Sequence, residues 1–444
     1  MKAIRLSFLA ILVVPTILWL FADTWVPEPF TYFSFRAVFI QYSGVIGIGV
    51  MSIAMLLALR PHRLEPMFHG LDKMYRLHKW LGITALVVAI VHWWWAQGTK
   101  WMVGWGWLTR PPRRTGGGQG LGHVDGWLRS QRGFAENLGE WAFYAVVVLI
   151  VLALIKRFPY HLFQKTHKWL AVGYLVLVYH ALILTKTSYW AQPIGWLLAI
   201  LLLSGTAAAF WILAGRVGAG RRVLGTVDAL TYYPEMRVLE TGIRLEEGWP
   251  GHAAGQFAFV RSSRKEGAHP YTIASAWTPE NPHIVFITKA LGDHTSRLRE
   301  HLKIGLPVSV EGPYGCFDFA DGQPRQIWVG AGIGITPFVA RLKQLAGAPD
   351  EKAIDLFHTT ADFEQAAIDK LKADAEAAGV HLHLLVDSKD GRLDGETIRK
   401  AVPDWSSASL WFCGPPGFGK ALRDDFIRHG LPPDRFHQEL FHMR

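Results

Sequence analysis

Four histidines stand in long apolar stretches, where ionisable side chains are costly and usually serve a function. They form two pairs, His78 with His92 and His167 with His180. The first pair is fourteen residues apart, about 21 Å along one face of a helix. The second pair is thirteen apart, which does not return to the same face. We therefore expect the second helix to bend or bulge, or to hold its two histidines at different azimuths.

Neutral imidazole is a good iron ligand, and helix bundles commonly hold cofactors between facing helices. Because the two spans run in the same direction, we expect His78 to face His167 at one level and His92 to face His180 at the other. This predicts two haems, each held by two histidines, in a bilayer about 30 Å thick. One such histidine would more often be a satisfied polar residue in the bundle interior, but two pairs favour metal binding.

Glycine-rich turns mark a second candidate site. A predicted strand, Gln326–Val329, runs into a turn and then a helix from Phe338. Strand, turn and helix N-terminus together bind the phosphates of a dinucleotide. The candidate contacts there are Gly330, Gly332, Gly334, Thr336 and Pro337.

A later strand ends in Cys413, Gly414 and Pro415. A small polarizable side chain before a rigid turn suits the docking edge of a nicotinamide ring, so Cys413 is a candidate catalytic residue. The alternative is a small buried core residue at a strand end.

A third candidate site lies between the other two. An aromatic hydroxyl, a threonine and a serine that can bond a flavin ring and its ribityl chain occur in one short segment, which comprises His269, Pro270, Tyr271, Thr272 and Ser275. Further on, Lys289, Gly292 and Thr295 surround the start of a predicted helix, whose N-terminus can hold a pyrophosphate. The alternative is a polar loop on a barrel.

Three kinds of element must position these residues. A membrane span needs about 20 apolar residues. Six stretches qualify: 4–21, 36–59, 75–95, 138–155, 169–185 and 193–213. Short strands broken by Gly and Pro then predict an antiparallel β-barrel, and the last part has an α/β pattern. The expected fold is thus multidomain: a transmembrane haem bundle at 1–215, a barrel binding FAD at 216–325 and an α/β nucleotide-binding domain at 326–444.

Charge and composition argue against some classes of function and predict how the spans are oriented in the membrane. The net charge is +10, but the basic residues lie largely in short loops between spans, which argues against nucleic acid. The loops after the second, fourth and sixth spans are basic, which predicts a cytoplasmic N-terminus and soluble half. Residues 96–137 oppose this rule, being expected as a basic loop of roughly forty residues on the outer side.

The two cysteines form no disulfide framework or iron–sulfur site. The first apolar stretch ends in bulky residues and predicts a retained span.

These motifs resemble the bacterial ferric reductase and NADPH oxidase family of transmembrane flavocytochromes. The resemblance covers the whole chain and adds four features. His269 stands where related soluble reductases carry Arg. Residues 311–315, including Gly312, resemble a glycine-rich loop of the family. The tail at 437–441 is similar to one whose aromatic, here Phe441, covers the flavin. Residues 386–392 resemble the place where related reductases hold the 2′-phosphate of NADPH, with Ser388, Lys389 and Arg392 as contacts, the alternative being a solvated hairpin loop.

The resemblance implies electron transfer from NADPH or NADH through FAD and two b-type haems to an acceptor outside. Ferric chelate is slightly favoured over dioxygen, because the basic residues at 96–137 would concentrate anionic chelates. The alternatives are a superoxide-generating NADPH oxidase and an electron-donating membrane subunit for a partner redox protein. The implied location is a bacterial inner membrane. The expected partners are a small-molecule acceptor and the lipid bilayer, with no nucleic acid and no obligate protein partner.

Overall fold

The structure is a computed structural model that describes residues 2–109, 123–263 and 266–439. The chain divides into two compact units. The first comprises the residues up to Pro61 together with Lys73–Val217. The second comprises the short segment His62–Asp72 and the chain from Gly218 onward. Each unit is considered by itself below.

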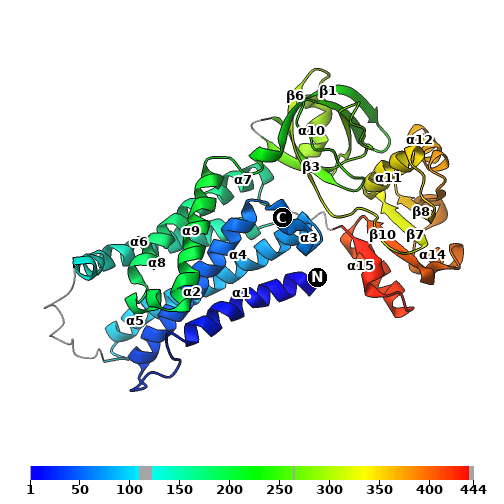
Figure 1. The fold of residues 1–444 in the computed structure, drawn as a ribbon. Coiled ribbons are helices and arrows are strands. Elements are labelled where there is room, and N and C mark those ends of the chain that lie inside the picture. Colours follow the sequence, from blue (N-terminus) through cyan, green and yellow to red (C-terminus); the bar gives the residue numbers. More distant parts are fainter. Residues whose placement is uncertain (1, 110–122, 264–265, 440–444) are drawn as a thin grey trace. The chain divides into compact units, whose positions relative to one another are not determined.

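The first unit is helical, and six of its helical segments are long and apolar enough to cross a membrane (Figure 1). This number agrees with the six stretches expected from the sequence, and the chain is a multi-pass membrane protein. Helix α2 is the most buried of the six. The α-helices of this unit are α1 (Lys2–Leu20), α2 (Tyr32–Ala58), α4 (Leu71–Trp93), α5 (Thr99–Gly104), α6 (His123–Leu154), α7 (Tyr160–Lys168), α8 (Leu170–Leu184) and α9 (Pro193–Leu213).

The expectation of a structureless loop at residues 96–137 is wrong for the part that the structure describes. Helix α4 continues through a π-helical turn at Trp94–Gly98 into α5, and α6 begins at His123. A helix that extends past the apolar core of a bilayer can carry polar and charged residues, so a hydropathy window ends before the helix does. Three of the six basic residues of this stretch, Arg110, Arg113 and Arg114, lie outside the described residues.

The helix that carries the second histidine pair is interrupted, which fits the first of the two alternatives that its thirteen-residue spacing left open. Helix α7 ends at Lys168 and α8 begins at Leu170, with Trp169 between them. At this break the N–H of Trp169 donates to the carbonyl of Thr166, which is a tight i→i−3 turn. This break lies between His167 and His180.

The second unit begins with a six-stranded antiparallel sheet in the order β4-β3-β6-β1-β2-β5. A bridge between Ile273 and Phe286 joins the two ends of this order, which gives the expected barrel. The helix α10 (Asp293–His301) follows the last strand of that order. The strands are β1 (Arg222–Tyr233), β2 (Val238–Leu245), β3 (Phe257–Ser263), β4 (Gly267–Thr272), β5 (His283–Lys289) and β6 (Pro307–Tyr314).

A five-stranded parallel sheet follows, in the order β11-β10-β7-β8-β9. The chain starts in the middle of this sheet and winds outward in both directions, so the order reverses between β7 and β10. In sheets of this kind ligands bind at that switch point, beyond the carboxyl ends of the strands. The strands are β7 (Arg325–Ala331), β8 (Ala353–Thr360), β9 (His381–Val386), β10 (Ala408–Cys413) and β11 (Phe436–Gln438), and the α-helices are α11 (Thr336–Gly347), α12 (Gln365–Ala377), α13 (Asp387–Asp390), α14 (Gly395–Ala401) and α15 (Pro416–Arg428).

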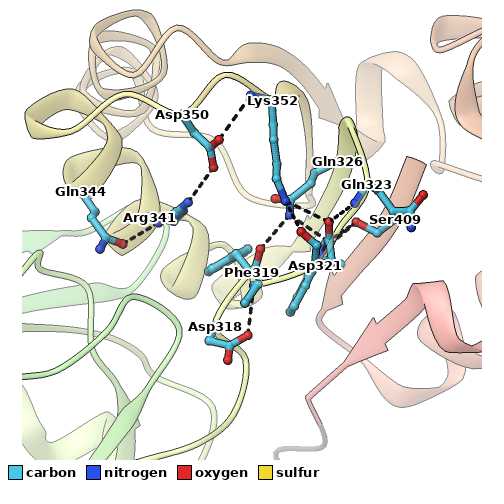
Figure 2. Close-up of polar contacts among 12 residues, drawn as sticks. Asp318, Phe319, Asp321, Gln323, Gln326, Arg341, Gln344, Asp350, Lys352 and Ser409 are labelled. Atoms are coloured by element: carbon cyan, nitrogen blue, oxygen red, sulfur yellow. Dashed lines mark hydrogen bonds and ion pairs between the residues drawn. The ribbon is translucent and has the colours of Figure 1, made fainter. Parts of the chain in front are cut away.

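A buried carboxylate ties the connection between the two sheets to the parallel sheet. Figure 2 shows Asp321, which accepts hydrogen bonds from Ser409, Gln326 and the backbone N–H of Gln323 and pairs with Lys352 at 3.0 Å. The indole of Trp411 donates to the same carboxylate at 3.0 Å. Burial by itself would raise the pKa of Asp321, but these donors outweigh it and lower the pKa.

Replacing Asp321 with alanine is expected to destabilise the second unit by about 3 kcal/mol, because it leaves buried donors without an acceptor. The midpoint of thermal unfolding, followed by the release of FAD, should fall by roughly 5–10 °C. Since the folded-state pKa is lowered, this stabilisation is present at neutral pH and is lost as the pH falls below about 4. The control is Asp318→Ala, which removes an exposed carboxylate three residues earlier. Equal midpoints for the two variants would contradict the role given to Asp321.

Candidate cofactor-binding sites

The four histidines of the helical unit form the two pairs expected from their spacing. His78 and His92 lie on α4, while His167 lies on α7 and His180 on α8. The ring centroids of His78 and His167 are 5.9 Å apart, and those of His92 and His180 are 6.4 Å apart. Neither pair is joined by a hydrogen bond in the described part of the chain.

Backbone carbonyl oxygens fix the tautomers of two of these rings, and a hydroxyl contacts a third. The Nδ1 atom of His78 lies 3.0 Å from the carbonyl oxygen of Ala54, and that of His180 lies 2.8 Å from the carbonyl oxygen of Ala135. A carbonyl oxygen only accepts, so Nδ1 carries the proton and Nε2 keeps its lone pair. The Nδ1 atom of His92 lies 2.9 Å from the hydroxyl of Ser43. Metal-bound histidines are oriented in this way by their second nitrogen.

The centroid separation in each pair would suit one haem iron held by the two imidazoles. Metal–imidazole bonds of about 2.0–2.1 Å place ring centroids on opposite sides of one metal roughly 6 Å apart, close to the separations seen here. Glycine makes room for one of these rings, because a Cβ atom at Gly139 would lie 2.0 Å from Nδ1 of His180. The Nδ1 atom of His167 is buried without a hydrogen-bond partner among the described residues, and this ring packs instead against Phe163, with centroids 5.0 Å apart.

The nucleotide motifs meet at the switch point of the parallel sheet. Gly330 at the end of β7 lies opposite Cys413 at the end of β10. Gly332 has a φ of +57°, in the left-handed region that favours glycine. Gly334 packs directly on β10, because a Cβ atom there would lie 2.2 Å from the carbonyl oxygen of Cys413. The helix α11 begins at Thr336, whose hydroxyl donates to the carbonyl of Ile333, with Pro337 in its first turn.

Cys413 is fully buried, and burial together with the nearby carboxylate of Glu439 raises the pKa of its thiol. A protonated thiol is a poor nucleophile, so the environment favours a docking role over covalent chemistry. Gly414 and Pro415 follow, and α15 begins at Pro416. Phe441, expected to cover the flavin, lies outside the described residues.

The segment that contains the flavin candidates lies beside the start of α10. The ring of His269 stacks on that of His294 at 3.6 Å between centroids, and the hydroxyl of Tyr271 lies 2.8 Å from Nε2 of His294. Burial, and then the neighbouring His294, lower the pKa of His269 to about 4. The two segments chosen from the sequence are thus brought together, and His294 was missed although it stands between Gly292 and Thr295.

The other residues that the sequence predicted as flavin or nucleotide contacts make different hydrogen bonds and ion pairs. The hydroxyl of Thr295 accepts from the N–H groups of Leu291 and Gly292 and so holds the first turn of α10. Lys289 pairs with Asp362 at 2.5 Å. The hydroxyl of Ser275 accepts from the N–H of Val285. The other candidate residues lie in two places. In the barrel, Pro270 and Thr272 lie on β4 and Gly312 lies on β6. After β9, Ser388 and Lys389 lie on α13, and Arg392 lies just after it.

Two residues near these sites carried no usable signal in the sequence. Glu65, on the short helix α3 (Glu65–Phe68), is buried in the second unit. Its Oε1 accepts from the backbone N–H of Gly315 at 2.6 Å, so it holds the glycine-rich loop after β6. Burial raises the pKa of Glu65 despite this bond. His358, at the end of β8, is also buried, and its Nδ1 lies 2.9 Å from the carbonyl oxygen of Gly330.

Two family models match the chain. Residues 43–178 match the ferric reductase like transmembrane component, and residues 230–317 match an FAD-binding domain. The first match contains all of His78, His92 and His167, and the second contains the flavin segment of the barrel. His180 lies just past the end of the first match.

Individual relatives resemble parts of the chain. The vanillate O-demethylase oxidoreductase of Pseudomonas sp. is 26% identical over 38% of this chain and 53% of its own length. The heavy chain of a superoxide-generating NADPH oxidase from Dictyostelium discoideum is 27% identical over 47% of this chain and 43% of its own. Ferric reduction oxidase 4 of Arabidopsis thaliana is 34% identical over 22% of this chain and 15% of its own.

The chain spans only about half the length of the first of these relatives. Six membrane-spanning helices, an antiparallel flavin barrel and a parallel nucleotide-binding sheet nevertheless occur in one chain with both matching domains. The chain therefore combines a segment similar to the ferric reductase like transmembrane component with a segment similar to an FAD-binding domain.

Proposed function

We propose that the protein moves electrons across a membrane, from NAD(P)H through FAD and two b-type haems to a ferric chelate on the opposite side. The observation that carries this proposal is the pair of facing histidines at each of two levels of α4. The levels are about 21 Å apart along this helix, which is most of the thickness of a bilayer core. A bundle that only anchored the dehydrogenase would gain nothing from two such pairs of histidines.

The residues of the chain bind, orient and exclude water. Gly330, Gly332 and Gly334 let the backbone approach the nucleotide phosphates at the start of α11. Buried Cys413 shapes the wall where the nicotinamide ring docks. The oriented imidazoles present the lone pairs of Nε2 to the metal. When bound, the flavin converts a two-electron hydride donor into single electrons, which haem iron accepts one at a time.

The direction of transfer follows from the charges of the short loops. Arg60, Arg63, Lys156 and Arg157 lie in connections that follow the second and fourth spans. Basic residues are retained on the cytoplasmic side, so the N-terminus and the second unit would be cytoplasmic. By this topology the His78–His167 pair would lie at the cytoplasmic level of the bundle, and the His92–His180 pair at the external level.

An anionic acceptor is favoured by exposed basic side chains near the His92–His180 pair. Lys100 on α5 and Arg129 and Arg132 on α6 are exposed. Glu136 and Glu140 lie within the next two turns of α6 and reduce the local positive charge, so the preference for an anionic acceptor is modest. The relatives include both a superoxide-generating NADPH oxidase and a ferric reduction oxidase, so ferric ion and dioxygen are both candidate acceptors. Dioxygen is neutral and gains nothing from positive charge, whereas ferric citrate is an anion.

Replacement of both Arg129 and Arg132 by glutamine is expected to raise the apparent KM for ferric citrate by a few-fold, with the rate of flavin reduction unchanged. The effect should shrink at high salt, because exposed charges are screened beyond about 10 Å at 0.1 M ionic strength. The measurement is anaerobic NAD(P)H oxidation by the purified protein, with ferrous ion counted by a chelating dye.

The control is the pair of substitutions Lys156→Gln and Arg157→Gln, just beyond the other end of α6. It should leave the KM unchanged. If NAD(P)H oxidation instead required dioxygen and produced superoxide in matching amounts, with no ferric reduction in its absence, the protein would be an oxidase and the ferric proposal would fall.

A further inference from the structure

Three possible metal ligands meet at the edge of the parallel sheet, away from the flavin and nucleotide motifs. Asp355 is the third residue of β8, and His381 and His383 lie on β9, the last strand of the sheet. Alternate residues of a strand point to the same side, so both imidazoles share one face. The parallel register sets Asp355 opposite His381 and Phe357 opposite His383.

The donor atoms already converge. Nδ1 of His381 lies 3.2 Å and Nε2 of His383 lies 3.1 Å from the same oxygen, Oδ1 of Asp355. All three atoms lie within 4.8 Å of one another. Zinc bonds of about 2.0–2.2 Å at tetrahedral angles hold ligand atoms roughly 3.3 Å apart, so only a small adjustment is needed. The ring of His383 is held by stacking on Phe357, with centroids 4.2 Å apart and planes 4° from parallel.

The surroundings of these three residues favour a metal site that solvent can reach and that binds with moderate affinity. Nη1 of Arg325 lies 2.5 Å from Oδ2 of Asp355, which turns Oδ1 toward the imidazoles. Metal-bound carboxylates are commonly fixed by such a second contact. The charge of the guanidinium opposes a cation, however, and weakens the site. The side chain of His381 is 73% exposed, while that of Asp355 is 6% exposed, so a metal can enter from solvent and keep bound water.

We propose that Asp355, His381 and His383 bind a divalent transition metal of the zinc type and thereby fasten the edge strand β9 to β8. Two imidazoles and one carboxylate suit zinc and its neighbours rather than magnesium or calcium, which prefer oxygen ligands. The cluster lies near the amino ends of the strands, opposite the carboxyl edge where Gly330 and Cys413 lie. The metal would therefore stabilise the nucleotide-binding sheet and take no part in hydride transfer.

The test compares zinc binding by the metal-stripped full-length protein, purified without a histidine tag, with that of His381→Asn combined with His383→Gln. Asparagine and glutamine can still donate to Asp355, so the metal-free variant should fold. Titration calorimetry should show one zinc per chain for the unaltered protein, with affinity weakened about tenfold or more in the double variant. Zinc should raise the midpoint of FAD release for the unaltered protein, and EDTA should reverse the rise.

The matched control is His429→Asn, at the end of α15, where another histidine lies beside a carboxylate, that of Asp425, at 3.5 Å. It should bind zinc as the unaltered protein does. If the double variant kept the same zinc affinity and the same rise in midpoint, the three residues would be a hydrogen-bonded cluster only and the proposal would be overturned. Absence of saturable zinc binding to the unaltered protein would have the same consequence.

Discussion

Replacing Gly139 with alanine is expected to remove the haem assigned to the His92–His180 pair. The added Cβ atom would lie 2.0 Å from Nδ1, 2.6 Å from Cε1 and 2.7 Å from Cγ of His180, so the whole imidazole would have to move. That ring is held by the carbonyl of Ala135, one turn earlier on the same helix, and has little freedom to shift without losing this contact. Overpacking of this kind costs about 1–3 kcal/mol and displaces side chains from their positions.

The expected result is one haem per chain in place of two, measured by the pyridine haemochrome absorbance of the purified protein. Reduction of the flavin by NAD(P)H should continue, while reduction of the external acceptor should be lost. Alanine is a better helix former than glycine by about 1 kcal/mol, so weakening of α6 cannot account for the loss. The control is Gly133→Ala on the same helix, where an added Cβ atom meets nothing within 4 Å. Two haems in both variants would show that this pair of histidines does not hold one.

The sequence was sufficient to predict the large elements because their signals are local. Apolar stretches of about 20 residues identify spans whatever they pack against. A strand, a glycine-rich turn and a helix in succession identify the phosphate loop at Gly330–Pro337. The thirteen-residue spacing of His167 and His180 predicted either an irregular helix or two histidines at different azimuths, and the helix is interrupted at Trp169.

Contacts that depend on backbone atoms or on pairing between distant segments could not be predicted in this way. The oxygens that orient His78 and His180 are the carbonyls of Ala54 and Ala135, and every residue has a carbonyl. Asp355 meets His381 and His383 only because β8 pairs with β9 in one particular parallel register. The extension of helices into residues 96–137 also escaped prediction, because hydropathy measures the bilayer core and not the length of a helix.

Replacing Gly334 with alanine is expected to slow hydride transfer to the flavin by about tenfold or more, equivalent to about 1.4 kcal/mol of barrier. Its Cβ atom would lie 2.2 Å from the carbonyl oxygen and 2.6 Å from the carbonyl carbon of Cys413, and 2.9 Å from the nitrogen of Gly414. These are backbone atoms at the end of β10, so relief requires the phosphate loop to separate from the strand where the nicotinamide is proposed to dock.

Such a separation moves the phosphate loop away from the end of β10, where Cys413 is proposed to position the nicotinamide ring. A misplacement of about 1 Å can cost two orders of magnitude in rate. Anaerobic stopped-flow measurement of flavin bleaching by NADPH and by NADH tests the expectation, with FAD and haem contents unchanged. The control is Gly347→Ala at the end of α11, where an added Cβ atom meets nothing within 4 Å. Cys413→Ser should have a smaller effect, because it keeps the backbone and nearly the size of a buried, protonated thiol. Bleaching at the same rate in Gly334→Ala and Gly347→Ala would mean that hydride transfer does not depend on the packing of this loop against β10.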